Sequence, residues 1–303
     1  MFATLLGPLP RPPLDRDASV DALVGAAVRA QEEAGLEPIT DGGLRGQDEL
    51  VAAWRATAGH TLRAVKQVIT GPYTFGRSER IHASQRSRLT LARAASLNAV
   101  LRELAAAGCP LIEVHEPEAI TIGADPAARA LFREAHLRLL DGVEGSHMAL
   151  ALTGGNADAA GIDTILAAPY ASLAVDLIAG PDNWRLVAVT PGDRGIVCGA
   201  LPAEAGTADG PELLLWAAGY AASTGGRGSR RVGLATASSL AHLPWADAVG
   251  KLERLGEAAR LADLPVGERV QALDPRAVSS RSAALGRVPP PPSRGPDRGQ
   301  DPT

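Results

Sequence analysis

Short apolar runs alternate with amphipathic stretches along most of this 303-residue chain. Nearly every run is followed by a stretch with apolar residues at helical spacing, of which 84–107 is the longest, and glycine or proline marks many of the boundaries. Regular alternation of strands and helices implies parallel strands joined by right-handed crossovers. The pattern therefore predicts an α/β protein.

Eight strands are predicted, over residues 3–6, 38–40, 64–70, 110–114, 148–152, 173–178, 195–198 and 231–235. Eight strand–helix units in a chain of about this length match the size of a (β/α)8 barrel. A doubly wound sheet is the alternative, but it would usually place a glycine-rich phosphate turn after its first strand, and Gly7-Pro8-Leu9-Pro10 is not such a turn. We therefore predict a single (β/α)8 TIM barrel over residues 1–273, with its functional site at the carboxyl ends of the strands.

The composition changes over residues 274–303, which contain four consecutive prolines at 289–292 and few apolar residues. Such a segment cannot bury enough surface to offset its ordering entropy, so it is predicted to be a disordered Pro/Arg-rich tail. A polyproline run is also a ligand type for SH3-like domains, although a solvated tail is the favoured interpretation.

Charge and cysteine content exclude several classes of protein. Thirty basic and 34 acidic residues give a net charge of −4, and no arginine cluster is interleaved with aromatic residues, which argues against nucleic-acid binding. The chain has neither an apolar run of about 18 residues nor a signal-peptide pattern at its start, so we expect no membrane association and a cytoplasmic location. The two cysteines, Cys109 and Cys198, are expected to be reduced thiols, and two cysteines cannot build a cysteine-rich zinc site.

Polar residues gather where the predicted strands end: Asp41, Thr70, His115-Glu116, Gly154-Gly155-Asn156, Asp176 and Ser238. Because the carboxyl ends of barrel strands meet at one mouth, His115, Glu116 and Asp176 are expected to lie near one another. A histidine with two carboxylates could perform acid–base chemistry or bind a divalent metal. The alternative is that Glu116 belongs to a structural turn and that His115 fills space. Cys198 follows Ile and Val, which indicates a buried small apolar residue.

Four segments resemble the cobalamin-independent methionine synthase family. Residues 107–117, AGCPLIEVHEP, are similar to the family's AGC-x-x-I-x-x-DEP strand, and residues 31–42, QEEAGLEPITDG, are similar to its QEE-x-G-[LI]-x-x-[IL]-TDGE segment. Residues 4–12 and 68–74 resemble the motifs T-x-x-GS-x-PRP and I-x-GP-x-T. The matches follow the family's order, from residue 4 to about 262. The resemblance implies a methyltransferase-family protein of the UROD/methionine-synthase-like superfamily, with a C-terminal or core-type barrel.

The resemblance also implies a zinc ion that holds homocysteine as its thiolate, bound by one His, two Cys and one Glu. Here the corresponding positions carry Leu152, Gly154, Ser238 and Asp176, and three of these four cannot bind zinc. The positions that contact homocysteine in the family are changed as well, to Pro8, Gly43 and His115. A second alignment, with the zinc histidine at His147, is disfavoured because it places that residue at the start of its strand. We therefore expect a degenerate zinc site and no certain cofactor.

Two hypotheses about function follow. The first is a diverged methyl or alkyl transferase, or a related acid–base enzyme, acting on a small anionic substrate that Arg45 or Arg77 could pair with. Its expected catalytic residues are His115, Glu116 and Asp176, and its expected substrate-binding residues are Asp41, Thr70, Gly154, Asn156 and Ser238. A corrinoid protein is a partner implied by the resemblance alone. The second hypothesis is a non-catalytic barrel, a pseudoenzyme, that binds a small molecule or a partner protein.

Overall fold

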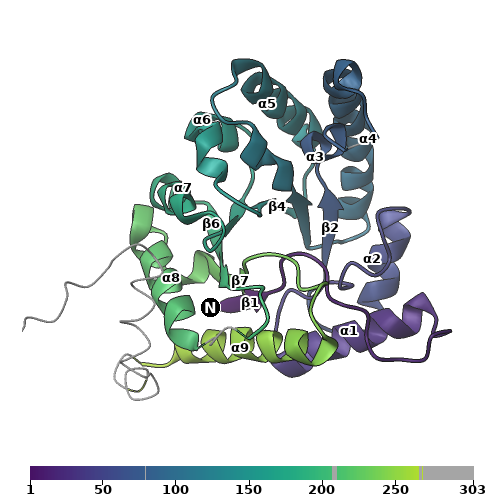
Figure 1. Ribbon diagram of the computed structural model, residues 1–303, viewed down its shortest axis with the longest axis vertical. Coiled ribbons are helices and arrows are strands. Elements are labelled where there is room, and N and C mark those ends of the chain that lie inside the picture. The colour runs from purple at the N-terminus through teal and green to yellow at the C-terminus, as the bar shows by residue number, and fades with distance from the viewer. Residues whose placement is uncertain (79, 207–209, 266–267, 269–303) are drawn as a thin grey trace, which may run out of the picture.

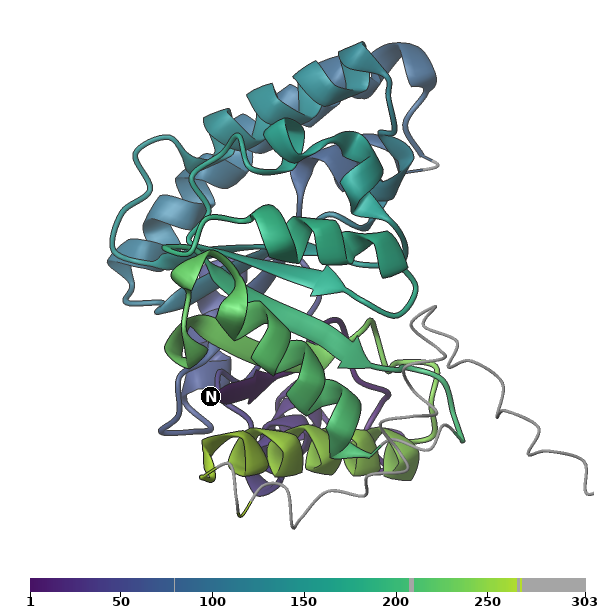
Figure 2. The same ribbon diagram turned by 90° about the vertical axis from the view of Figure 1, so that its left-hand side faces the viewer.

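A parallel sheet of seven strands forms the centre of the molecule in the computed structural model, which describes residues 1–78, 80–206, 210–265 and 268. The strand order is β1-β7-β6-β5-β4-β3-β2, and the sheet is curled, with helices around its outside (Figures 1 and 2). The strands are β1 (Phe2–Thr4), β2 (Lys66–Thr70), β3 (Leu111–His115), β4 (His147–Leu152), β5 (Ser172–Asp176), β6 (Gly195–Leu201) and β7 (Val232–Thr236). The tail predicted over residues 274–303 lies outside the described residues.

Helices connect successive strands, which confirms the predicted alternation. They are α1 (Val20–Ala34), α2 (Leu50–Ala58), α3 (Pro72–Gly76), α4 (Arg86–Ala106), α5 (Pro126–Leu140), α6 (Ile162–Ile165), α7 (Trp184–Val189), α8 (Pro211–Ser223) and α9 (Trp245–Asp263). Helix α9 packs against α1 near one edge of the sheet, and α4 packs against α5 near the other. The short helices α3 and α7 were not predicted, and short 3-10 turns accompany several of the loops.

The segment predicted as a strand at 38–40 is reduced to a single parallel bridge between Ile39 and Val65. The amide of Glu37 donates to the carbonyl of Ala3 at 2.9 Å, and the amide of Lys66 donates to the carbonyl of Ile39 at 2.9 Å. The segment therefore contacts both β1 and the start of β2, which are the two edge strands of the sheet. What the structure shows is a seven-stranded curled sheet with one bridging segment.

Apolar cores lie on both faces of this sheet. The larger fills the space between the sheet and the helices and includes Leu152, Cys198 and Val114. The smaller lies inside the curl and consists of Leu6, Ala151, Ala174, Val197 and Ala235, with Phe2 packed against it. Bulky branched residues usually fill the interior of such a sheet. Three of the five buried residues here are alanines, so the interior retains room for other groups.

The strand register brings the carboxyl ends of the strands to one level. Thr70 pairs with His115, His115 with Ala151, and Asp176 with Gly199. The mouth formed by these ends is the place where parallel α/β proteins of this shape build their sites. In the described part of the chain, every helix is too short or too polar to cross a bilayer.

Candidate functional site at the carboxyl end of the sheet

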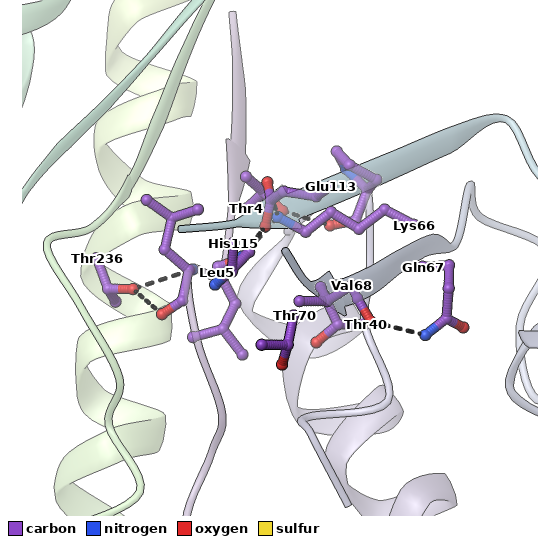
Figure 3. A network of polar contacts seen from close by, with 12 residues as sticks. Thr4, Leu5, Thr40, Lys66, Gln67, Val68, Thr70, Glu113, His115 and Thr236 are labelled. Carbon is purple, nitrogen blue, oxygen red and sulfur yellow. Dashed lines mark hydrogen bonds and ion pairs between the residues drawn. The ribbon is translucent and has the colours of Figure 1, made fainter. Parts of the chain in front are cut away.

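A chain of three ionisable side chains runs through the inside of the sheet towards the mouth. Lys66, the first residue of β2, places its Nζ 2.7 Å from Oε2 of Glu113, in the middle of β3. The other carboxylate oxygen of Glu113, Oε1, lies 2.7 Å from Nε2 of His115, the last residue of β3. Lys66 Nζ also donates to the carbonyl of Leu5 at 2.8 Å. Figure 3 shows Lys66 extending from β2 to Glu113, with His115 further along the same strand.

Burial and neighbouring charges determine the protonation states of Lys66 and Glu113. The side chains of Lys66 and Glu113 are 0% and 2% exposed, respectively. Burial by itself would raise the pKa of Glu113, but the Lys66 charge and the hydrogen bond and charge of His115 together outweigh it and lower the pKa to about 2. Burial lowers the pKa of Lys66, and the Glu113 carboxylate works against that shift. Glu113 is therefore an anion at neutral pH, held between a lysine and a histidine.

His115 is the member of this chain that reaches the mouth, with 15% of its side chain exposed. A carboxylate beside Nε2 favours the tautomer in which Nε2 carries the proton, because that nitrogen can then donate to Glu113. The other ring nitrogen, Nδ1, has no hydrogen-bond partner among the described residues, so it keeps a free lone pair. A histidine oriented in this way by a carboxylate can act as a general base.

Asp176 lies at the end of β5, where it is 1% exposed. Its Oδ1 accepts hydrogen bonds from the amides of Ile178 and Ala179, both at 2.9 Å, and its Oδ2 accepts one from the amide of Gly154 at 3.0 Å. Because its carboxylate accepts hydrogen bonds from three backbone amides, Asp176 holds the loops after β4 and β5 in place.

The next loop contains Asn156, whose side chain exchanges hydrogen bonds with Asp182 at 2.9 and 3.1 Å. Asn183, which the sequence analysis did not single out, is fully buried and donates to the carbonyls of Gly155 and Asp176. Gly154 has a φ of +89°, a conformation that glycine adopts without steric cost. The space at its Cβ position is open, whereas its amide is already donated to Asp176.

Glu116 is fully buried just beyond His115, and its carboxylate is directed to the first turn of α3. Oε1 accepts from the amide of Tyr73 at 2.9 Å, and Oε2 accepts from the amide of Thr74 at 2.6 Å. The buried His136 on α5 places Nε2 3.2 Å from the same carboxylate. Burial, followed by the charge of Glu116, raises the pKa of Tyr170, whose hydroxyl lies 2.6 Å from His136 Nδ1.

Three further candidates surround the mouth. Asp41 accepts hydrogen bonds from the amides of Gly43 at 2.8 Å and Arg45 at 3.1 Å, so its carboxylate shapes its own turn. Thr70 ends β2 beside His115, and its amide donates to the side chain of Gln47 at 2.7 Å. Ser238 lies two residues beyond β7 and is half-buried.

The two arginines proposed for anion binding already have protein partners. Arg45 forms an ion pair with Asp21, and Arg77 stacks over the ring of Tyr73 at 4.8 Å.

The three predicted catalytic groups therefore have separate hydrogen-bond partners. Among the described residues, no hydrogen bond or ion pair joins His115, Glu116 and Asp176 to one another. The partner of His115 is instead Glu113, which is paired in turn with Lys66, and the sequence analysis missed both residues. A signal was present, because Lys66 is one of two lysines in the chain and Glu113 interrupts an apolar strand. A charged residue within a buried strand is uncommon unless it is paired.

The residues present do not fit the zinc ion that the resemblance implies. No group of three or more His, Cys, Asp or Glu side chains is placed to hold a metal in the part of the chain that the structure describes. Leu152, at the position of the zinc histidine, packs in the core on the helix side of the sheet and not at the mouth. Cys109 and Cys198 are free and buried, and burial raises the pKa of their thiols to about 11 and about 12. These thiols stay protonated, whereas zinc is bound by thiolates.

The curled parallel sheet, its ring of helices and the polar groups at its carboxyl end define a protein of the α/β barrel-like class. A sequence profile described as "Cobalamin-independent synthase, N-terminal domain" matches residues 46–202, just over half of the chain. The chain belongs to the cobalamin-independent methionine synthase family. The matching profile describes the N-terminal domain, whereas the motifs favoured the core-type barrel.

Solved structures share this fold at low sequence identity. A B12-independent methionine synthase from Shewanella sp. W3-18-1, in complex with selenomethionine, superposes with a TM-score of 0.73 at 15% identity, covering 89% of this chain and 99% of that one. A putative vitamin-B12-independent methionine synthase from Listeria monocytogenes gives 0.68 at 13% identity, covering 86% and 97%. A methyltransferase from Methanosarcina mazei gives 0.50 at 14% identity, covering 70% and 63%. No curated protein matches.

Proposed function

We propose that this family member is a methyl or alkyl transferase that works without a zinc-bound thiolate and uses His115 as its general base. The observation that carries the proposal is the Lys66–Glu113–His115 chain, with hydrogen-bond distances of 2.7 Å at both links and its last member at the mouth. In many active sites, buried charged residues orient a partly exposed histidine that transfers a proton. The Lys66–Glu113 pair and His115 have this arrangement.

The proposed reaction begins when Nδ1 of His115 takes the proton from the thiol of a homocysteine-like acceptor. The thiolate sulfur then forms a bond to the methyl carbon, and the bond between that carbon and the donor's leaving group breaks. The leaving group departs with the bonding electron pair and takes the proton back from His115, so charge and atoms balance. Glu113 stabilises the imidazolium that exists between these steps, as an anion beside a positive ring does.

Substrate binding is proposed at the loops that surround His115. Thr70 and Ser238 are proposed to contact the substrate from the ends of β2 and β7, and the loop at Gly154 is proposed to lie beside it, since the space at its Cβ position is open. Asp41, Asn156, Glu116 and Asp176 are proposed to act as positioning residues, because their side chains hold backbone or side-chain groups of the neighbouring loops. A methyl donor carried by a corrinoid protein remains part of the proposal through the family resemblance alone.

The test is methyl transfer to homocysteine from methylcobalamin or from methyltetrahydrofolate. We expect His115→Gln to lower kcat/KM by about 10²- to 10⁴-fold, as removal of a general base does. The matched control is His60→Gln, because His60 pairs with Asp21 outside the mouth. Full activity in the His115→Gln variant would contradict the proposed base.

A second function, a non-catalytic binding protein, is favoured by one observation. Several polar groups at the mouth already have protein partners: Asp41, Glu116 and Asp176 accept two or three backbone amides each. If folded protein shows no turnover with either methyl donor, and His115→Gln binds homocysteine as the parent does, the second function replaces the first.

We also propose that the segment at 38–40 completes the sheet as an eighth strand, which makes a closed (β/α)8 barrel. The bridge between Ile39 and Val65 and the hydrogen bond from Thr4 Oγ1 to the Pro38 carbonyl, at 2.8 Å, support this closure. Hydrogen exchange tests it: the amides of Glu37, Ile39 and Lys66 should be protected as strongly as those of β3. Rapid exchange at Ile39 would indicate an open sheet.

A further inference from the structure

A cavity of about 350 Å³ lies at the end of the sheet opposite the mouth. Its position follows from its lining, because six of the residues that form it are the first residues of their strands: Phe2, Lys66, Leu111, His147, Ser172 and Gly195. This volume falls within the range of small-molecule sites, about 300–1,000 Å³. The established site location for this kind of fold is the carboxyl end, so a cavity at the amino end needs its own explanation.

Small side chains inside the sheet leave this space open. Ala149 and Gly195 line the cavity where larger aliphatic residues would close it. Gly233 on β7 has the ring of Phe2 against it, so close that an added Cβ would lie 2.4 Å from the ring atoms. The ring of Phe2 is thereby held beside β7, and the wall is apolar and of defined shape.

The cavity changes character from its inner end to its opening. Its walls include Phe2, Leu111, Ala149 and Val197, and its inner end is the Lys66–Glu113 pair. Lys66 Nζ uses two of its three donors, on Glu113 and on the Leu5 carbonyl, and the third has no partner among the described residues. The inner end of the cavity is polar but carries no net charge, because the Lys66 ammonium is paired with the Glu113 carboxylate.

The opening carries two exposed arginines and one carboxylate. Arg231 donates to the carbonyl of Gly192 at 3.0 Å, while Arg230 has no ion pair or hydrogen bond within the described residues. Asp193 is the acidic residue among the lining groups at this opening. His147 lies 2.8 Å from the Ser172 hydroxyl, and burial lowers its pKa, so it adds no charge at neutral pH. The opening is therefore net positive.

We propose that this cavity binds a small amphipathic monocarboxylate, with its apolar body between Phe2, Leu111 and Val197 and its carboxylate at Arg230 and Arg231. Guanidinium groups bind carboxylates through paired hydrogen bonds, which a single lysine or backbone amide does not provide. The site is distinct from the mouth, but it shares the Lys66–Glu113 pair with it. A ligand bound in this cavity would contact Lys66 and Glu113, the two members of the Lys66–Glu113–His115 chain that lie furthest from the mouth.

The test measures binding of three probes of equal length to the full chain by titration calorimetry: octanoate, octylammonium and 1-octanol. We expect octanoate to bind at least tenfold more tightly than either of the other two. The double variant Arg230→Gln/Arg231→Gln should weaken octanoate binding tenfold or more, whereas Arg254→Gln, which removes an arginine on α9, should leave it unchanged. The variant Ala149→Leu should abolish binding by filling the space.

Three results would overturn the proposal: no octanoate binding at millimolar concentration, equal binding of all three probes, or unchanged octanoate affinity in the double arginine variant. Both arginines are exposed, so their substitution should leave the core packing intact. Circular dichroism melting of Ala149→Leu separates lost binding from lost folding. Because the readout is binding and not turnover, the outcome does not depend on whether His115 is catalytic.

Discussion

Lys66 and Glu113 place a full charge pair inside the curled sheet, and their energetics govern the candidate site. Bringing two charges out of water costs several kcal/mol per ion, and close contact with further hydrogen bonds offsets that cost. Both conditions hold here, because the pair is 2.7 Å apart and each member has another partner, Leu5 for the lysine and His115 for the glutamate. The pair therefore orients His115 without being a large source of net stability.

Removing the charge of Glu113 alone should be costly. Glu113→Gln leaves the Lys66 ammonium without its counter-ion, and we expect the free energy of unfolding to fall by about 3–5 kcal/mol. The double variant Lys66→Met/Glu113→Leu should recover most of this loss, because it removes both charges together. Urea denaturation measures both. The control is Glu257→Gln in the exposed pair with Arg254, for which we expect a change below about 1 kcal/mol.

Acid should weaken the fold through the same carboxylate. In the folded chain, despite burial, the Lys66 charge and the contact with His115 hold the pKa of Glu113 at about 2, below the ordinary glutamate value of 4.5. As the pH falls below about 4.5, the unfolded chain binds a proton that the folded chain does not, so stability is lost progressively down to about pH 2. Urea unfolding at pH 6, 4 and 3 should give a steeper loss for the parent than for Lys66→Met/Glu113→Leu. Parallel curves would contradict the low pKa.

At the scale of elements, the loop after β3 and the helix α3 depend on each other. The buried carboxylate of Glu116 satisfies two amides at the start of α3, a role that an acidic group at a helix start performs well. Gly71 precedes that helix, and a Cβ there would lie 2.1 Å from Oε1 of Glu116. The glycine is needed for the close approach of the carboxylate, since its φ of −69° is ordinary.

Gly71→Ala should therefore displace Glu116 from the two amides. We expect the free energy of unfolding to fall by about 2–3 kcal/mol, the cost of losing hydrogen bonds to a buried charge. Hydrogen exchange at Tyr73 and Thr74 should accelerate with it. The control is Gly219→Ala within α8, where a Cβ meets nothing within 4 Å. That substitution should raise the free energy of unfolding by about 0.5–1 kcal/mol. A glycine-to-alanine change is thus expected to destabilise the protein at position 71 and to stabilise it at position 219.

The sequence predicts long elements with clear end signals better than short ones. The longest predicted helical stretch, 84–107, is observed as α4, Arg86–Ala106, and α5 and α8 begin at Pro126 and Pro211, a position where proline is compatible with a helix. By contrast, α3 is five residues long and depends on Glu116 from another loop. The segment at 38–40 forms one bridge because its contacts come from β1 and β2. Tertiary contacts of this kind leave no local pattern.

The same reasoning explains which part of the site was predictable. His115 was identified because alternation places it at a strand end, and strand ends meet at the mouth. Its connection to Lys66 depends on register: Lys66 pairs with Leu111, so its side chain must reach diagonally to Glu113, two residues further along. Register between strands separated by a long helix cannot be inferred from either strand alone.

At the scale of the molecule, the first and last described elements are joined. Strand β1 pairs with β7, and α9 packs against both strands and against α1. The amino group of Met1 lies 2.6 Å from Asp263 Oδ1 at the end of α9. Helix α9 buries Ala248, Leu252 and Leu255 against this part of the core. The cooperative unit should therefore extend through α9.

Two shortened chains test this boundary. A chain ended after residue 273 should keep the free energy of unfolding of the full protein within about 0.5 kcal/mol, as changes away from packed features do. A chain ended after Leu243 lacks α9 and uncovers its apolar partners, so it should lose the cooperative unfolding transition. Urea denaturation followed by circular dichroism measures both. A loss above about 1 kcal/mol in the longer chain would mean that residues 274–303 stabilise the fold, and the predicted domain boundary would be wrong.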